Sequence, residues 1–193
     1  MQIQPIRSGS TTCWLLRWAG RTVLVDAGDA RDKAFLRRLT RAIDPQQIEL
    51  IFLTHGHRGH IGHANLLQTR YGIPCALSPA DLPLASQTDA QLSPAFHTPE
   101  GLPPSAAALP CAGHTAGSHA LRVGEHLFVG DAVTVRPFVR LPRRMDDPDA
   151  ALQSLRQLCT CGAKTVYPAH GRPFSIERLR RFVTKQTGEE FFP

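Results

Sequence analysis

The sequence has no long hydrophobic run. No stretch approaches the roughly eighteen consecutive apolar residues that a membrane-spanning helix needs. The first residues, Met1-Gln-Ile-Gln-Pro, contain no positively charged segment followed by an apolar run, so they predict no secretory signal. We therefore expect a cytoplasmic protein with no membrane partner.

Regularly paired cysteines are lacking in the sequence. The five cysteines include no Cys-x-x-Cys pair, and their number is odd. Disulfide-stabilised small domains and structural zinc ribbons need regular pairs, so the sequence predicts neither. A Gly-x-Ser-x-Gly elbow is also missing, which argues against a serine nucleophile. We interpret all the cysteines as core or spectator thiols: Cys13, Cys75, Cys111, Cys159 and Cys161.

Internal repeats and low-complexity linkers are absent from the 193 residues. This length and a hydrophobic content of 42% are typical of one globular domain, so we predict a single domain over residues 1–193. The net charge of +6 can attract anions. No block of five or six like charges occurs, so we interpret most of the charge as solvated surface and expect no nucleic-acid partner.

The hydrophobic pattern predicts strands early in the chain and alternating helices and strands later. Period-two and short apolar runs predict strands at residues 12–18, 21–25, 48–53, 74–78, 120–123, 126–129 and 164–167. Helical spacing predicts helices at residues 29–43, 61–71, 150–159 and 175–182, the last capped by Ser175. Residues 79–110 predict no clear element and leave open whether they form a lid. The pattern indicates a mixed α/β protein.

Four short motifs lie where predicted strands end. They are His55-x-His57-x-x-His60, Gly113-His114-Thr115, Gly130-Asp131-Ala132 and Pro168-Ala169-His170-Gly171. Residues two apart in an extended turn point the same way, so the first two histidines can hold one ion. Neutral imidazole and carboxylate groups suit Zn²⁺, Fe²⁺ or Mn²⁺. The sequence therefore predicts a metal site built on strand-end loops.

These motifs, in this order, resemble the metallo-β-lactamase superfamily and in particular its short glyoxalase-II-like members. The segment Val23-Leu-Val-Asp26-Ala-Gly28 resembles the family's early strand and turn aspartate. The resemblance covers residues from about 10 to about 175. It implies an α+β or α/β fold, a four-layer αβ/βα sandwich, with one or two metal ions at its edge.

The resemblance also implies a role for each motif residue. His55, His57 and His114 are the implied ligands of a first metal, and Asp131 is the implied carboxylate shared between two metals. His60 and His170 are the implied ligands of the second metal. Asp26 is implied to brace the metal-binding loop from behind. We expect zinc, one or two ions, with Fe²⁺ or Mn²⁺ as alternatives.

Gly59 departs from the family pattern. The family usually has His-x-His-x-Asp-His, and the aspartate is a ligand of the second metal, whereas glycine has no side chain. A zinc site with fewer protein ligands must recruit water or stay weakly occupied. His63 lies three residues after His60, so a helix would place both on one side. The sequence leaves open whether His63 or water replaces the missing ligand, or whether His63 has a supporting role.

The resemblance implies hydrolysis of a small ester, thioester, lactone or amide by a metal-bound hydroxide. Asp131 and His170 are the candidate catalytic residues, and Arg136 and Arg140 can attract an anionic substrate. One alternative is an oxidoreductase similar to the mononuclear iron persulfide dioxygenases, which share the fold. Another, favoured by Gly59, is a non-catalytic metal-binding protein. The sequence leaves the substrate, the native metal and the oligomeric state open.

Overall fold

The computed structural model describes residues 1–87, 105–188 and 191. The chain forms two compact units, Met1–Thr98 and Pro99–Pro193, each with its own sheet and hydrophobic core. Residues 88–104, the middle of the segment 79–110 for which the sequence left a lid open, lie outside the described part. The prediction of a single domain over residues 1–193 stays a prediction.

The first unit is built on a five-stranded mixed sheet with the order β1-β2-β3-β4-β5. Its strands are β1 (Gln2–Ser8), β2 (Thr11–Trp18), β3 (Arg21–Val25), β4 (Leu50–Phe52) and β5 (Cys75–Ala76). The first three strands are antiparallel, and β3, β4 and β5 are parallel. Ala19 and Gly20, both at positive φ, form the tight turn between β2 and β3. Two positive φ angles are typical of the type I′ turn, which matches the twist of the strands.

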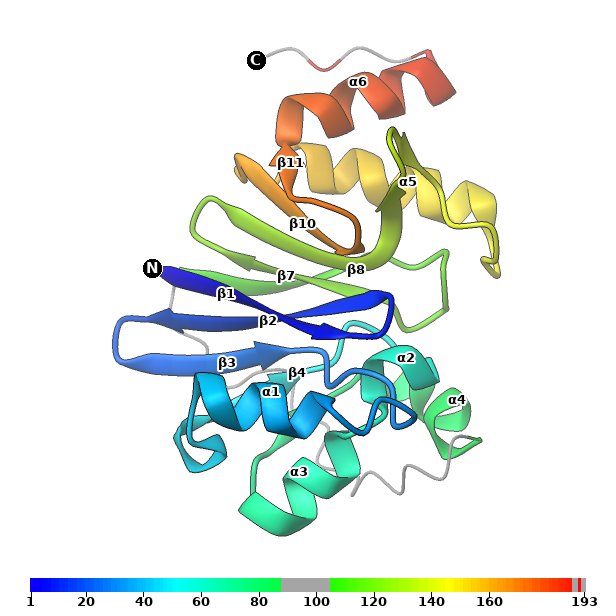
Figure 1. Ribbon diagram of the computed structural model, residues 1–193. Coiled ribbons are helices and arrows are strands. Elements are labelled where there is room, and N and C mark those ends of the chain that lie inside the picture. Colours follow the sequence, from blue (N-terminus) through cyan, green and yellow to red (C-terminus); the bar gives the residue numbers. More distant parts are fainter. Residues whose placement is uncertain (88–104, 189–190, 192–193) are drawn as a thin grey trace. The chain divides into compact units, whose positions relative to one another are not determined.

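Helices cover one face of this sheet (Figure 1). They are α1 (Phe35–Ala42), α2 (Arg58–Ile61), α3 (Ala64–Tyr71) and α4 (Leu82–Ser86), with short 3₁₀ turns η1 (Pro45–Gln47) and η2 (Pro79–Asp81). Phe35 and Leu39 of α1 and Leu67 of α3 are fully buried in the same core as Leu24 and Ile51 of the sheet. This packing fixes the parallel strands whose ends carry the first histidine motif.

The second unit is built on a six-stranded mixed sheet with the order β11-β10-β8-β7-β6, and β9 pairs with β8. Its strands are β6 (Ala106–Pro110), β7 (His119–Val123), β8 (His126–Val135), β9 (Val139–Arg140), β10 (Thr165–His170) and β11 (Phe174–Ser175). Strands β8 and β10 are parallel, and the other pairs are antiparallel. The parallel pair brings the third and fourth motifs onto neighbouring strands.

Two helices, α5 (Pro148–Cys159) and α6 (Ile176–Thr187), pack against each other and cover this sheet (Figure 1). Leu155 of α5 and Leu179 of α6 are fully buried in the core of this unit. The Asp147 side chain caps α5 by accepting hydrogen bonds from the amides of Asp149 and Ala150. Ser175 occupies the N-cap position of α6, as predicted. Its side chain makes no capping hydrogen bond, so the predicted cap was wrong.

Two mixed sheets with helices confirm the predicted α/β fold class, but several boundaries were wrong. The helix predicted at residues 29–43 begins only at Phe35, because Asp29 and Asp32 bind the backbone amides of residues 31 and 34 and form turns instead. The helix predicted at residues 61–71 is interrupted after Ile61. The amides of Gly62 and His63 bind the carbonyls of residues 28 and 27 rather than their own helix.

In the second unit the strands are longer than predicted. The strand predicted at residues 126–129 continues to Val135, so Asp131 lies within β8 and not at a strand end. The strand predicted at residues 164–167 continues to His170. Both predicted loop ligands therefore lie within strands. His170 pairs with Thr134, whereas Asp131 lies at an irregularity of the β8–β10 pairing, between Gly130 and Thr134.

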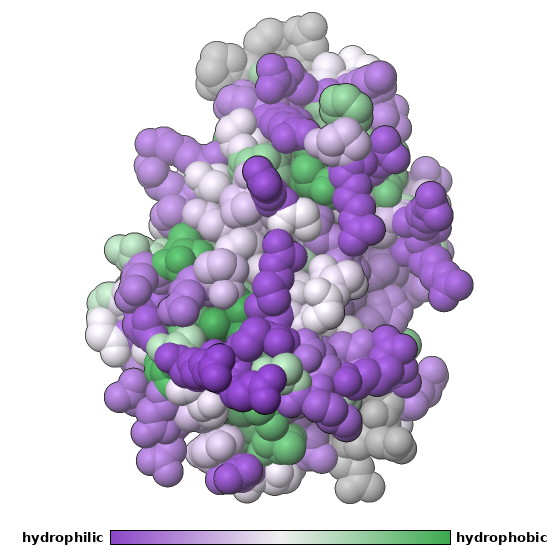
Figure 2. Space-filling view, viewed as in Figure 1, coloured by the Kyte–Doolittle hydropathy of each residue, from purple (hydrophilic) through white to green (hydrophobic). Residues whose placement is uncertain are grey.

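The surface drawn in Figure 2 is mostly hydrophilic, with small hydrophobic patches between polar side chains. Large exposed hydrophobic side chains among the described residues are few: Met1, Leu66 and Phe138. Within the described ranges, no helix combines the length and the apolar character needed to cross a lipid bilayer.

Candidate metal centre

The loop that carries the first histidine motif is held by the carboxylate of Asp26. This residue directly follows β3, is 2% exposed and has a positive φ of 63°. Its Oδ1 accepts hydrogen bonds from the Thr54 amide and hydroxyl, both at 2.9 Å. Its Oδ2 accepts one from Nδ1 of His60 at 2.7 Å. One buried carboxylate therefore fixes both ends of the segment from Thr54 to His60.

The ring of His55 is fixed by its neighbour in the chain. Its Nδ1 lies 3.1 Å from the Thr54 hydroxyl. Since that hydroxyl donates a hydrogen bond to Asp26, it accepts a hydrogen bond from Nδ1 of His55. The ring centroid of His55 lies 4.8 Å from that of His57 and 4.0 Å from that of His60. The structure therefore gathers the three histidines of this motif into one cluster.

His63 lies in the same unit, where its side chain contacts Ala27 and Phe35. Its side chain is buried, its Nδ1 donates to the Ala27 carbonyl at 3.1 Å, and its ring packs on Phe35 with centroids 4.8 Å apart. Burial lowers the pKa of His63, partly offset by the hydrogen bond to Ala27. This geometry holds the backbone beside Asp26.

The predicted ligands of the second unit gather around Asp131. Its Oδ2 lies 3.6 Å from Nε2 of His114, and its Oδ1 lies 3.3 Å from Nε2 of His170. The carboxylate thus faces a different imidazole with each oxygen. Its side chain is 13% exposed, so the group is largely shielded from water. Asp131 therefore links the second and the fourth motif within this unit.

His114 is oriented by the backbone. Its Nδ1 donates a hydrogen bond to the carbonyl of Arg144 at 2.9 Å, because a carbonyl can only accept. Its loop is closed by a bond between the hydroxyls of Thr115 and Ser118 at 2.8 Å. Gly113 sits at a φ of 135°, and a Cβ there would lie 2.4 Å from Cα of Ala151. The loop therefore approaches α5 as closely as only glycine allows.

The donor set fits a transition metal. Nδ1 is engaged by a protein acceptor in His55, His60 and His114, which leaves Nε2 of each neutral ring with its lone pair. Ligand histidines in proteins commonly have this pattern of support. The first unit offers His55, His57 and His60, and the second offers His114 and Asp131, as residues that could hold a metal ion. Imidazole with one carboxylate suits Zn²⁺ or Fe²⁺.

Gly59 lies in the middle of α2 and needs no special backbone conformation. A Cβ built there would have one neighbour within 4 Å, the hydroxyl oxygen of Thr11 at 3.5 Å, which is an ordinary contact. Neither strain nor crowding therefore requires glycine at this position. The family's aspartate is missing although the backbone would accept one.

Sequence reasoning missed three groups that support these residues: the Thr54 side chain, the Asp81 carboxylate and the Arg144 carbonyl. Thr54 directly precedes the motif, so its position was a usable signal. Asp81 binds the Gly56 amide at 2.8 Å from a segment that predicted no element. The Arg144 carbonyl could not have been predicted, because every residue has a backbone carbonyl and the sequence does not show which one accepts a hydrogen bond.

The cysteines take no part in these clusters. None of the five, all within the described residues, forms a disulfide, and four are buried. Burial raises the pKa of Cys75 and of Cys159 to about 12, so both stay protonated near neutral pH. Burial, together with the charge of Asp26, also raises the pKa of Cys13 well above its usual value. The interpretation of the cysteines as core residues is confirmed for the four buried ones, whereas their role as spectators stays a prediction.

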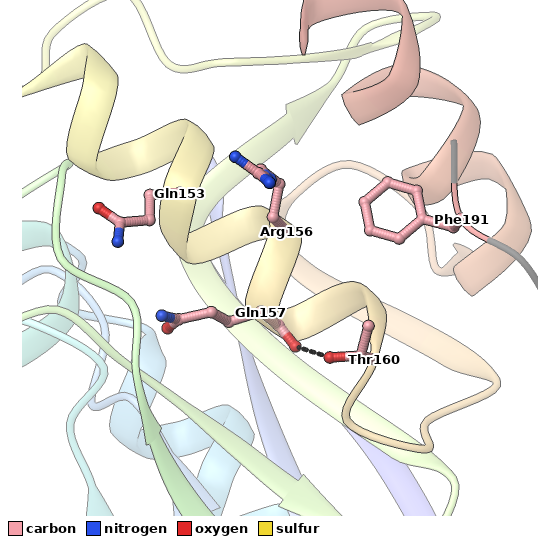
Figure 3. A pocket seen from close by; sticks show the side chains of 5 residues that line it. All are labelled: Gln153, Arg156, Gln157, Thr160 and Phe191. Carbon is pink, nitrogen blue, oxygen red and sulfur yellow. Dashed lines mark hydrogen bonds between the residues drawn. The ribbon is translucent and has the colours of Figure 1, made fainter. Parts of the chain in front are cut away.

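A separate pocket in the second unit contains none of the predicted ligands. It has a volume of about 370 Å³ and lies on the outer side of α5, lined by Gln153, Arg156, Gln157, Thr160 and Phe191 (Figure 3). The Thr160 hydroxyl donates to the carbonyl of Gln157 and ends this helix. Four of these five lining residues are polar or charged, and none of the five is a histidine or carries a carboxylate. It is therefore not a candidate for the chemistry.

Comparison with known proteins gives both a family and a curated relative. The model of the metallo-beta-lactamase superfamily matches residues 6–170. A hydroxyacylglutathione hydrolase of Shewanella loihica is 32% identical over 173 residues. That match covers 81% of this chain and 60% of the relative, so the chain spans less than two thirds of the relative's length.

Solved structures share the fold. An archaeal metallo-beta-lactamase superfamily protein from Sulfolobus tokodaii has a TM-score of 0.70 at 18% identity, over 99% of this chain and 88% of that one. The protein TTHA1623, solved in a di-iron-bound form, has a TM-score of 0.68 at 26% identity, over 92% of this chain and 96% of that one. With the family model matching most of the sequence, the chain belongs to the metallo-β-lactamase superfamily.

Proposed function

We propose that this protein is a metal-dependent hydrolase of a small ester, thioester, lactone or amide. The observation that carries the proposal is the orientation of the imidazoles: His55, His60 and His114 each donate from Nδ1 to a fixed acceptor. This leaves Nε2 as the metal-binding atom. Membership of the superfamily and the relative described as a hydroxyacylglutathione hydrolase support hydrolysis rather than another reaction.

We assign both ligand sets to one metal centre in a single domain. His55, His57, His114 and Asp131 would hold the first ion, and His60, His170 and Asp131 would hold the second. Because Gly59 supplies no carboxylate, the second ion has one anionic ligand fewer than the family pattern provides. We therefore propose zinc as the native metal, with full occupancy at the first site and weaker binding at the second.

The metal ion and the residues of the chain would have different roles in the reaction. A divalent ion bound here would lower the pKa of a water and polarise the substrate carbonyl. Asp131 would accept the proton of the attacking water on a carboxylate oxygen that is largely shielded from solvent. Asp26 and Thr54 would keep His60 and His55 in the tautomer that offers Nε2. His170 would fix Asp131 from the neighbouring strand.

We propose that the substrate carries a negative charge. Arg140 on β9 pairs with Thr134 on β8, and Thr134 pairs with His170 on β10. The arginine is therefore two strands away from a predicted catalytic residue at the same level of the sheet, and it is exposed. Arg136 is also exposed, at the turn between β8 and β9. Replacing both arginines with glutamine should raise KM for an anionic thioester and leave KM for a neutral one unchanged.

The decisive experiment measures metal content by mass spectrometry in the wild type and in Gly59→Asp, with Gly59→Ala as the matched control. About one zinc per wild-type chain, rising only in the aspartate variant, would support a hydrolase with an impaired second site. Turnover of generic thioesters that a chelator abolishes would support the reaction. Iron with sulfite production from a persulfide would favour the oxidoreductase. No metal in any of the three proteins would refute the proposal.

The location also remains a proposal. We propose a cytoplasmic protein without a membrane partner, as the sequence predicts, and cell fractionation would test it. A persistent membrane fraction after salt washing would contradict this proposal.

A further inference from the structure

The loop between His55 and His57 is held from a second direction by a residue outside the family motifs. The carboxylate Oδ2 of Asp81 accepts a hydrogen bond from the Gly56 amide at 2.8 Å. Asp81 is 1% exposed, and Gly56 is buried. The carboxylate therefore holds the amide of Gly56, the single residue that lies between two predicted metal ligands.

Asp81 does not use its side chain in the usual way for its position. It is the N-cap residue of α4, where an aspartate normally accepts a hydrogen bond from an amide of its own helix. Here the side chain makes no such capping bond. It reaches instead to Gly56, 25 positions earlier in the chain. The contact is thus specific to the histidine loop and not a by-product of helix capping.

The segment around Asp81 also packs tightly on the loop. A Cβ at Gly56 would lie 2.8 Å from the carbonyl oxygen of Asp81 and 3.3 Å from Cβ of Leu84. Any side chain at Gly56 would push this segment away, so glycine is required for the close approach. The η2 turn and α4 therefore act as a rigid support for the loop.

We infer that Asp81 is a positioning residue for the metal centre. Through the Gly56 amide it fixes the backbone that orients His55 and His57, and its buried charge favours a cation on those histidines. This inference rests on the proposed function, because it takes the two histidines as metal ligands. Supporting groups of this kind typically change metal affinity by about 10- to 100-fold when they are removed.

Two substitutions separate the charge from the hydrogen bond. Asp81→Asn keeps an oxygen that can accept from Gly56 but removes the charge, whereas Asp81→Ala removes both. Asp44→Asn is the matched control, since Asp44 is an exposed N-cap aspartate that binds the Gln46 amide. Zinc affinity would be measured by competition with a chromophoric chelator, alongside melting curves with and without zinc.

We expect about tenfold weaker zinc binding in Asp81→Asn, about 100-fold in Asp81→Ala, and no change in Asp44→Asn. The metal-free Asp81→Asn protein should melt close to the wild-type temperature, because the amide oxygen still accepts the hydrogen bond from Gly56. A purely structural role would instead lower the melting temperature and leave zinc affinity intact. Zinc affinity in Asp81→Asn equal to that of the wild type would overturn the inference.

A measurement on the wild type alone keeps the test valid if a variant fails to fold. Hydrogen exchange at the Gly56 amide should be strongly slowed in both metal-free and zinc-loaded protein, since Asp81 holds it in each. Exchange as fast as an exposed amide would refute the role of Asp81 whatever the metal does. Failure of the wild type to bind zinc would instead refute the proposed function, and with it the metal-centred role of Asp81.

Discussion

Asp26→Asn should damage metal binding far more than it damages folding. The asparagine fits the site, because it tolerates the left-handed backbone conformation that residue 26 adopts. Its carbonyl oxygen can replace Oδ1 and keep both bonds from Thr54. Its amide nitrogen then replaces Oδ2 and faces Nδ1 of His60 as a donor. His60 must accept at Nδ1, so the proton moves to Nε2 and blocks the atom that would bind metal.

The stability loss follows from the bonds that change. The substitution turns charge-assisted hydrogen bonds at a residue that is 2% exposed into neutral ones. Charged bonds are worth about 1.5–3 kcal/mol and neutral ones about 0.5–1.5 kcal/mol. We therefore expect a loss of about 1–2 kcal/mol, which a domain of ordinary stability survives. Metal affinity should fall by about 10- to 100-fold, because the supporting partner of a ligand histidine has been reversed.

The assay combines urea unfolding with zinc competition, and nitrogen NMR shifts report which imidazole nitrogen of His60 carries the proton. The control is Asp32→Asn, since Asp32 binds the backbone amides of Gly9 and Ala34 but no histidine. An Asp26→Asn protein that binds zinc within twofold of the wild type would refute the argument. So would an NMR spectrum with His60 still protonated at Nδ1.

Three further predictions concern the support of the two units. Gly113→Ala should lower the free energy of unfolding, measured with urea, by more than about 3 kcal/mol, because the new Cβ would overlap Ala151. Gly124→Ala, in open space at positive φ, should lower it by only about 1 kcal/mol. Equal losses in the two variants would contradict this prediction. Asp147→Ala should cost about 1 kcal/mol through loss of the α5 cap, measured by thermal melting; an unchanged melting temperature would count against it. Burial lowers the pKa of His63, so its stabilising contribution is complete above the unfolded pKa near 6.5 and is lost as pH falls through the lower folded pKa. His63→Gln should therefore lose less stability than the wild type between pH 7.5 and 5.5.

The fold class followed from local patterns, but the boundaries depended on contacts between distant segments. The edge strand β1 was not predicted, since its side chains alternate only weakly and Pro5 interrupts it. The break after Ile61 could not be foreseen either. It arises because the Gly62 amide binds the Gly28 carbonyl at 2.7 Å, a contact across more than thirty residues of sequence. Tertiary hydrogen bonds override local helix propensity at such points.

The sequence predicted the candidate metal ligands of the site. It predicted far fewer of the groups that orient these ligands by hydrogen bonds. The histidines and Asp131 could be named because their spacing and chemistry are distinctive. The pattern could also name Asp26, but not the three donors that it binds. Asp81 acts from a segment with no periodic pattern, and the Arg144 support comes from a backbone carbonyl. Supports of this kind belong to the folded chain and not to any local stretch of sequence.

The buried carboxylates that hold the histidine loop bear on whether this protein has an active metal centre or has lost metal binding. Gly59 favours a protein that has lost metal chemistry, since it removes an anionic ligand. Asp26 and Asp81 argue the other way, because burying two carboxylates at 2% and 1% exposure costs free energy unless hydrogen bonds and positive charge offset it. Thr54, His60 and Gly56 supply the hydrogen bonds, and a divalent cation on the neighbouring histidines would supply the charge.

Without a cation, neutralising these two carboxylates should therefore cost little stability. The combined variant Asp26→Asn with Asp81→Asn should be less stable than the wild type by only about 1–2 kcal/mol when both are metal-free, and by clearly more than that when both are saturated with zinc. This widening of the difference is the signature of a loop that holds a cation. If zinc stabilises both proteins equally, the carboxylates serve the fold alone, and Gly59 marks a site that no longer depends on them.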